Sequence, residues 1–301
     1  MRRKRLIHTW DLTKYYGQAT GVESLYMEVA EGETFGLLGL DGSGKSTTIR
    51  LLLGLTRPTR GQAEVLGFDI QRHSYQVRSL TGCVPGNFTF YGELTGTEFL
   101  GLCSQIRGNQ AERRSELEER LDLDSSLKFQ DYSIVDRQKI ALIQALMHDP
   151  PLVILDDPTI GLDHLSKEAF YEIIAEERAR GKTILLSTKS PPEIARLCDR
   201  VAILKGGYLE RTEDVVEMRN RLGRKVRVTF RHHIDLEDII TEDVSVVSHR
   251  EGEWVLAVRH EMGSLIQRLG QYSVKDVVYL EGAVEEALTE MLEGGPRVLV
   301  S

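Results

Sequence analysis

The sequence predicts an α/β protein with a phosphate-binding loop on a doubly wound parallel sheet, followed by a small α+β domain. An apolar run at residues 34–38 leads directly into a glycine-rich loop and then into a helical pattern. Further short apolar runs alternate with amphipathic helical segments, as in doubly wound sheets. After residue 222 the strands alternate like half-exposed ones. We therefore divide the chain into domains 1–222 and 223–301.

Each element follows from its local pattern. Continuous apolar runs typical of strands buried on both faces occur at 34–38, 152–155, 183–187 and 201–204, with further strands at 6–12 and 25–29. Helical spacing of apolar residues predicts helices over 47–53, 113–121, 137–147, 166–180 and 213–221. Helical patterns dominate about 86–148, which we interpret as an inserted helical subdomain. The last domain is expected to hold strands at 225–231, 253–259 and 274–280, with helices at 262–269 and 283–292.

Composition excludes several classes of protein. The 301 residues carry 46 acidic and 38 basic side chains, a net charge of −8, which disfavours a nucleic-acid partner. The three cysteines have spacings that fit neither a disulfide scaffold nor a metal pair, so we expect free thiols in a reducing compartment. The basic N-terminus is not followed by an apolar run, and no window is apolar enough for a membrane helix. We expect an intracellular protein that reaches a membrane through a partner.

The glycine-rich loop carries the strongest chemical signal. Residues 39–46 match the pattern G-x-x-x-x-G-K-[ST], with an apolar strand before it and a helix after it. In such a loop the backbone N–H groups and the helix dipole face the phosphates, while Lys45 reaches the β- and γ-phosphates. The alternative is a plain glycine turn between strand and helix. The candidate phosphate-binding residues are Gly39, Leu40, Asp41, Gly42, Ser43, Gly44, Lys45, Ser46 and Thr47.

A second strand supplies a candidate for holding metal. The run at 152–155 ends in Asp156 and Asp157, and a carboxylate at that place ligates Mg²⁺ together with the loop hydroxyl of Ser46. The alternative is a strand that simply ends in an acidic turn. Beside the phosphate loop we favour the Mg²⁺ site.

Further motifs follow in a recognisable order and spacing. They are Tyr16 within 12–17, Gly86 after Val84-Pro85, Ser133 within 132–136, Asp156-Asp157-Pro158, Asp163 within 161–163, and Lys189 after 186–188. With the loop at 39–47, they make residues 5–210 similar to the ATP-binding subunit of ABC transporters, in the branch of bacterial drug and polymer exporters. The region after about 224 more weakly resembles the small C-terminal domain of some members.

The resemblance implies roles for these residues. Tyr16 would stack on adenine, Ser133 and Asp163 would face nucleotide across a dimer interface, and the ligands would be ATP and Mg²⁺. A homodimer or heterodimer would close around ATP and act on a membrane permease, at the inner face of the cell membrane. The permease surface is expected near residues 87–100, with Phe88, Phe90 and Tyr91 as exposed aromatic candidates; ordinary core packing is the alternative for these three.

Several positions depart from the family pattern. Gly86 stands for the usual glutamine, and Val135 for a glycine where backbone approaches phosphate. Asp136 adds a negative charge there. Asp157 is one methylene shorter than the catalytic glutamate, and Lys189 replaces the switch histidine and accepts no hydrogen bond. We therefore expect that the chain binds Mg-ATP but hydrolyses it slowly or only with a partner, with Asp157, Lys189 and Gly86 as the altered catalytic positions.

Three alternatives remain at this point. The chain could be a normally hydrolysing motor that tolerates these changes, or a non-hydrolysing regulatory subunit that uses ATP as a structural ligand. The third is a soluble ABC protein acting on ribosomes or DNA, which the single ATP module and the acidic charge disfavour. In the last domain, His232 and His233 are expected to be a solvated loop pair, and Trp254 and Tyr272 core or interface residues.

Overall fold

A computed structural model describes residues 4–86, 92–108, 111–232, 239–241, 243–250, 252–258, 262–280 and 282–293. The chain divides into two compact units, Met1–Thr212 and Glu213–Ser301. Helix α8 (Val215–Leu222) therefore belongs to the second unit, whereas the sequence placed it at the end of the first domain. The division lies before this helix.

The first unit is built on one ten-stranded sheet in the order β5-β4-β1-β2-β10-β9-β3-β8-β7-β6. One part is antiparallel and comprises β1 (Arg5–Tyr16), β2 (Ala19–Ala30), β4 (Arg60–Val65) and β5 (Phe68–Asp69). In the other part β3, β6, β7, β8 and β9 pair in parallel. Its strands are β3 (Thr34–Leu38), β6 (Thr81–Val84), β7 (Leu152–Asp156), β8 (Thr183–Thr188), β9 (Arg200–Lys205) and β10 (Tyr208–Asp214), the last joined in parallel to β2.

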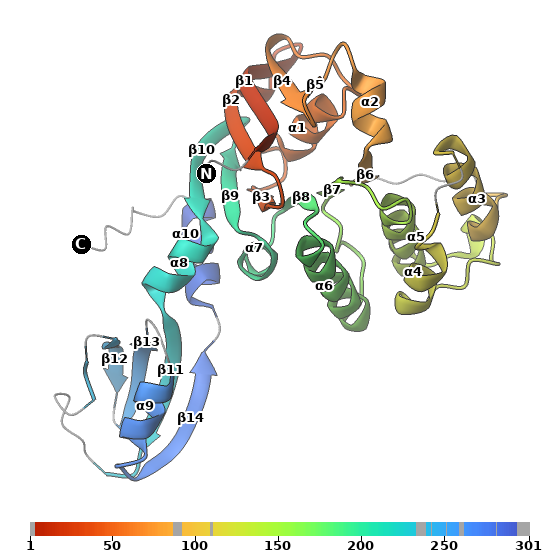
Figure 1. The fold of residues 1–301 in the computed structure, drawn as a ribbon. Coiled ribbons are helices and arrows are strands. Elements are labelled where there is room, and N and C mark those ends of the chain that lie inside the picture. The colour runs from red at the N-terminus through yellow and green to blue at the C-terminus, as the bar shows by residue number, and fades with distance from the viewer. Residues whose placement is uncertain are drawn as a thin grey trace. The chain divides into compact units, whose positions relative to one another are not determined.

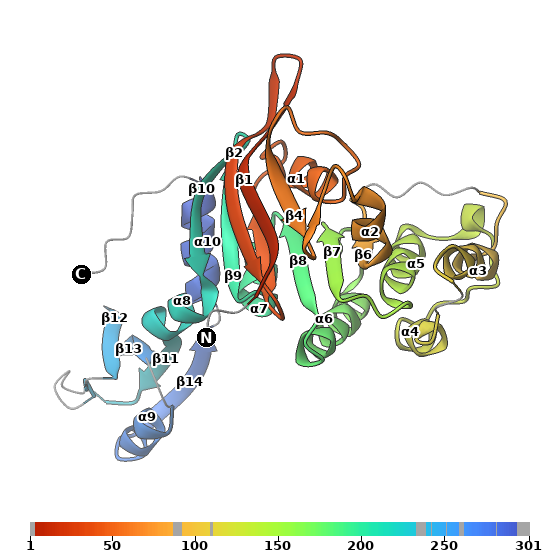
Figure 2. The ribbon, with the colours of Figure 1, turned by 45° about the horizontal axis from the view of Figure 1, so that its top comes forward.

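Helix α1 (Lys45–Leu52) lies where the two parts of the sheet curl toward each other (Figure 2). It contacts β2 and β4 of the antiparallel part and β7 and β8 of the parallel part. Ile49, Leu51 and Leu52 are buried in this core. The helix that follows the glycine loop is thus held from both sides, and this fixes the loop in place.

The remaining helices of this unit connect the strands. They are α2 (Ser74–Ser79), α3 (Gly96–Ile106), α4 (Arg114–Arg120), the 3₁₀ turn η1 (Phe129–Asp131), α5 (Ile134–Leu146), α6 (His164–Ala179) and α7 (Pro191–Leu197). Helices α3, α4 and α5 lie together beside the edge strand β6, and α5 contacts both other helices and the strand (Figure 1). The expected permease surface begins in residues 87–91, so Phe88, Phe90 and Tyr91 lie outside the described residues.

Strands β3, β7 and β8 carry the functional edge of the sheet. Every residue of these strands is buried, which is why their sequences are continuous apolar runs rather than alternating ones. Because the strands are parallel, their carboxyl ends meet at one edge, where ligands bind in open α/β sheets. The glycine loop follows β3, Asp157 follows β7 and Lys189 follows β8.

The second unit has its own four-stranded antiparallel sheet, in the order β12-β13-β11-β14. Its strands are β11 (Arg224–Phe230), β12 (Val244–Arg250), β13 (Glu253–Val258) and β14 (Val274–Leu280), and its helices are α8, α9 (Met262–Leu269) and α10 (Ala283–Glu293). Trp254 is buried in the core of this unit, and Tyr272 packs against that core. His232 is exposed, and His233 lies outside the described residues. The sheet with helices agrees with the expected α+β character.

Two expectations about the whole chain bear on function. Within the described ranges, no helix combines the length and apolar character that crossing a bilayer requires. All three cysteines are free; Cys198 is buried and Cys83 and Cys103 are half-buried.

Candidate functional site

The glycine loop forms a tight cradle between β3 and α1. Gly42 and Gly44 have φ angles of 77° and 103°, a region that favours glycine, and they turn the backbone inward. A Cβ on Gly39 would lie 2.3 Å from Ser43 Oγ, and one on Gly44 would lie 2.5 Å from the carbonyl oxygen of Gly21. The buried hydroxyl of Ser43 has no hydrogen-bond partner within the described part of the chain. The curled backbone and the unpaired hydroxyl fit a bound phosphate.

The loop lines a pocket of about 290 Å³. Tyr16 stands at the end of β1 and is 45% exposed, so the side chain is accessible for stacking. Gly21 makes room for it, because a Cβ there would lie 2.9 Å from the Tyr16 ring. The pocket is lined by Tyr16, Thr20, Gly21, Asp41, Gly42, Ser43, Gly44, Lys45, Ser46, Thr47 and Asp157.

Lys45 lies inside the loop and is only 5% exposed. Its Nζ donates to the carbonyl oxygens of Gly39 at 2.6 Å and Leu40 at 3.2 Å. These acceptors are neutral, and the Asp157 carboxylate acts on the ammonium charge only from a longer distance, so the charge is incompletely compensated in a buried place. A phosphate at this position would supply the missing negative charge.

Asp156 lies at the end of β7, next to Ser187 of β8 in the strand register. The Ser187 hydroxyl donates to Asp156 Oδ1 and so orients the carboxylate. The other carboxylate oxygen, Asp156 Oδ2, faces Gly86, and a Cβ added to Gly86 would lie 3.0 Å from it. The glycine therefore fits closely against the carboxylate but carries no side chain toward it. With the hydroxyl of Ser46 on the loop, Asp156 provides hard oxygen donors of the kind that suit Mg²⁺.

Asp157 follows in a left-handed conformation with φ 48°, which aspartate tolerates better than most residues. Its side chain lines the pocket beside the loop. Burial raises the pKa of Asp157, and the positive charge of Lys45 opposes that rise. The Nζ of Lys189 is 3.4 Å from the carboxylate of Asp41, which lines the pocket. Asp157 and Lys189 are thus both brought to the glycine loop.

Residues 133–136 form the N-cap and first turn of α5, and Tyr132 ends the 3₁₀ turn before it. Ser133 is the N-cap residue, and its Oγ accepts a hydrogen bond from the Asp136 backbone at 3.1 Å. The same hydroxyl lies 2.6 Å from Asp136 Oδ2, to which it donates, and the Ser133 backbone N–H donates to that oxygen at 3.3 Å. This is a complete capping box. The Ser133 hydroxyl is therefore already engaged with a carboxylate of its own chain.

The segment after β7 is tied to the helix that carries Ser133. Gln138 of α5 donates to the carbonyl oxygen of Pro158 at 2.7 Å. A Cβ on Gly161 would lie 2.7 Å from Ile134 Cγ2, so the segment packs against the start of α5. Asp163 caps α6 by accepting from the Ser166 backbone at 2.8 Å, and this hydrogen bond lowers its pKa. Ile134, Asp163 and Ser133 are exposed on the protomer.

Four residues of this site were not predicted from the sequence. Thr20 and Gly21 complete the pocket, Ser187 orients Asp156, and Glu193 of α7 accepts from the Thr159 hydroxyl. The sequence did indicate Ser187, because this residue ends the strand predicted at 183–187, which follows the strand carrying Asp156 along the chain. The others depend on which hairpin folds over the loop and on how α7 packs.

Comparisons with known proteins agree with this geometry. Residues 22–160 match the ABC transporter family. The bacitracin transport ATP-binding protein BcrA of Bacillus licheniformis is 31% identical over 96% of this chain and 98% of its own length. The Nod factor export ATP-binding protein I of Rhizobium etli is 36% identical over 65% of this chain and 64% of its own. A solved structure of an ATP-binding subunit of an ABC transporter is 32% identical, with a TM-score of 0.67 over 72% of this chain and 92% of that chain.

Proposed function

The chain belongs to the ATP-binding proteins of ABC transporters, and from this we propose that it serves an exporter: it binds Mg-ATP, pairs with a second ATP-binding subunit and acts on a membrane permease. The relative named for Nod factor export supports the direction of transport. The observation that carries nucleotide binding is the pocket in which the glycine loop, Lys45 and Tyr16 come together.

The residues present define how the ligands would be held. Backbone N–H groups of residues 39–47 and Lys45 would bind the phosphates, and Tyr16 would stack on the base. Ser46 and Asp156 would hold Mg²⁺, which when bound neutralises phosphate charge. Ser187 keeps the Asp156 carboxylate oriented for this role.

We further propose that hydrolysis by this chain is slow or depends on its partner. Asp157 lines the phosphate end of the pocket, but its carboxylate reaches one methylene less than a glutamate would. General-base geometry is strict, and an error near 1 Å costs about a hundredfold in rate. Lys189 would favour bound ATP at least as much as the transition state, so its charge does not by itself accelerate the reaction.

The second defect lies on the surface offered to a partner subunit. Ser133 donates its hydroxyl to Asp136, so both the hydrogen bond and the negative charge oppose an incoming γ-phosphate. In a pair with an intact partner, one composite site would contain Asp157 and the other would contain Asp136. Each site would therefore carry at least one alteration, which also favours a regulatory subunit that binds ATP without turning it over.

The test is to restore Asp157→Glu together with Lys189→His and to measure ATP turnover of the full chain with its partner. A rise of at least about tenfold is expected from the geometric argument. If the unmodified chain already turns over as fast as the restored one, the proposal of impaired hydrolysis is wrong.

A further inference from the structure

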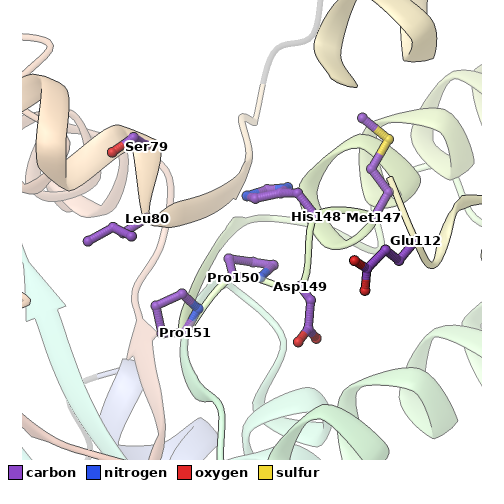
Figure 3. A pocket seen from close by; sticks show the side chains of 8 residues that line it. All are labelled: Ser79, Leu80, Glu112, Met147, His148, Asp149, Pro150 and Pro151. Atoms are coloured by element: carbon purple, nitrogen blue, oxygen red, sulfur yellow. The ribbon is translucent and has the colours of Figure 1, made fainter. Parts of the chain in front are cut away.

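A second cavity, of about 300 Å³, lies away from the nucleotide pocket. It is found where β6 and β7 begin, whereas Gly86 and Asp156 lie where these strands end. Segments from the entry to β6, from the approach to α4 and from the turn between α5 and β7 enclose it (Figure 3). Its lining residues are Ser79, Leu80, Glu112, Met147, His148, Asp149, Pro150 and Pro151.

The side chain of His148 makes this cavity unusual. It is 9% exposed, and its ring extends from the end of α5 toward Ser79 and Leu80 (Figure 3). Among the described residues, neither ring nitrogen has a hydrogen-bond partner of normal geometry. Buried polar groups are ordinarily hydrogen-bonded. The Gln144 carbonyl oxygen can serve only one of the two nitrogens, so the other nitrogen, beside a cavity, points to an occupant.

The protonation state of His148 fixes what that occupant must offer. Burial lowers the pKa of His148 to about 4, so at neutral pH the ring has one N–H donor and one acceptor nitrogen. The carbonyl oxygen of Gln144, one turn earlier in α5, raises this pKa and can interact only with the donor. The acceptor nitrogen is left for an N–H or O–H group of a ligand.

The charges around the cavity favour a neutral ligand. The positive charge of Arg107 acts on His148 and lowers its pKa, which disfavours a cation at that end. Asp149 is paired with Arg180 at 2.9 Å, Lys182 at 3.0 Å and Arg113 at 3.9 Å, so it leaves no uncompensated negative charge to attract a cation. At the other side Glu112 offers an exposed carboxylate that accepts hydrogen bonds.

The walls between these polar groups are apolar. Leu80, Met147, Pro150 and Pro151 present aliphatic and thioether surfaces, of the kind that pack against a flat ring. Within the described ranges, no group of three or more His, Cys, Asp and Glu residues is placed to hold a metal ion.

We propose that this cavity binds a neutral, planar, amino-substituted heteroaromatic molecule of aminopyrimidine type, whose N–H groups donate to His148 and Glu112. The proposal is independent of the nucleotide pocket and of the transport function.

The probe is 2-aminopyrimidine, titrated into the full-length chain at pH 7 while the Met147 methyl resonance and the His148 ring nitrogens are followed by NMR. Saturable shifts of both are expected. His148→Phe keeps a ring in the cavity but removes the acceptor nitrogen, and should weaken binding about fivefold to tenfold. His164→Phe, at an exposed position of α6 outside the cavity, is the matched control and should bind like the unmodified chain.

Glu112→Gln provides a second variant that does not disturb the buried ring, and it should also weaken binding. Absence of saturable shifts at Met147 and His148 would show that the cavity holds only water and would overturn the proposal. Equal binding by the His148→Phe and Glu112→Gln variants would overturn the assigned contacts.

Discussion

The capping box at the start of α5 leads to a direct prediction about dimer formation. Replacing Asp136 by glutamine removes the carboxylate to which the Ser133 hydroxyl donates at 2.6 Å. Glutamine still suits the third position of a capping box, so the helix should remain capped. The change therefore frees the hydroxyl and removes one negative charge without unfolding α5.

The size of the effect follows from the hydrogen bond that must be given up. A hydrogen bond to a charged group contributes about 1.5–3 kcal/mol. In the unmodified chain, Ser133 must lose this bond before it can donate to a γ-phosphate of the opposite subunit. Each dimer of two copies contains this motif twice, so Asp136→Gln should tighten ATP-dependent association at least about tenfold.

The assay is sedimentation of the purified full chain with magnesium and a slowly hydrolysed ATP analogue. Asp131→Asn, which removes an exposed charge from the neighbouring 3₁₀ turn, is the matched control and should leave association unchanged. Equal dimer dissociation constants for the unmodified chain and Asp136→Gln would refute the reasoning. So would an equal shift in the Asp131→Asn control, because it would assign the effect to net charge alone.

Three further predictions concern stability and ligand selectivity. Arg113→Met leaves the fully buried carboxylate of Glu177 without its main partner, and the free energy of unfolding in urea should fall by about 3 kcal/mol; a loss below about 1 kcal/mol would contradict this. The pKa of His148 is about 4 in the folded state, below its unfolded value, so protonation favours the unfolded state. The free energy of unfolding should be highest above about pH 6.5 and fall by about 2–3 kcal/mol toward pH 4, with a smaller fall in His148→Phe. Equal pH dependence of the unfolding free energy in the two proteins would refute this. Lys189→Ala breaks a solvent-exposed ion pair with Asp41 and should change the unfolding free energy by less than about 0.5 kcal/mol. Calorimetry should show that the affinity for ATP falls about tenfold relative to the affinity for ADP. An unchanged ratio of the ATP and ADP affinities would contradict this.

The sequence predicted the parallel part of the sheet well because its strands are buried on both faces. The runs predicted at 34–38, 152–155 and 183–187 are mostly apolar and leave few alternatives, and β3, β7 and β8 extend them by at most one residue. The glycine loop was predicted equally well, because its glycines are required by the local backbone conformation more than by contacts with distant segments.

The antiparallel strands and the edge elements were harder to predict. β4 is exposed at several positions and β5 has only two residues, so neither produces a strong alternation. β6 is only four residues long and includes Gly82, which lies so close to α5 that a Cβ would be 2.0 Å from the Ala145 carbonyl oxygen. That reason for a glycine becomes visible only when helix and strand are packed together.

The same distinction applies to the candidate site. Motif order placed Lys45, Asp156 and Asp157 before any contact was known. The engagement of Ser133 by Asp136 depends on where α5 begins, which the sequence pattern placed later, at residue 137. Helix ends depend on capping side chains and so shift by several residues, and here the shift determines which hydroxyl is free.

The most direct test of nucleotide binding is calorimetric titration of the purified full chain with ATP and magnesium, beside the Lys45→Ala variant. Saturable ATP binding is expected for the unmodified chain, with a loss of at least about tenfold in the variant, because the buried ammonium is the charge that meets the phosphates. If the unmodified chain takes up no ATP, or if Lys45→Ala binds it equally well, the residue 39–47 cradle is not a nucleotide site and the proposed role is wrong.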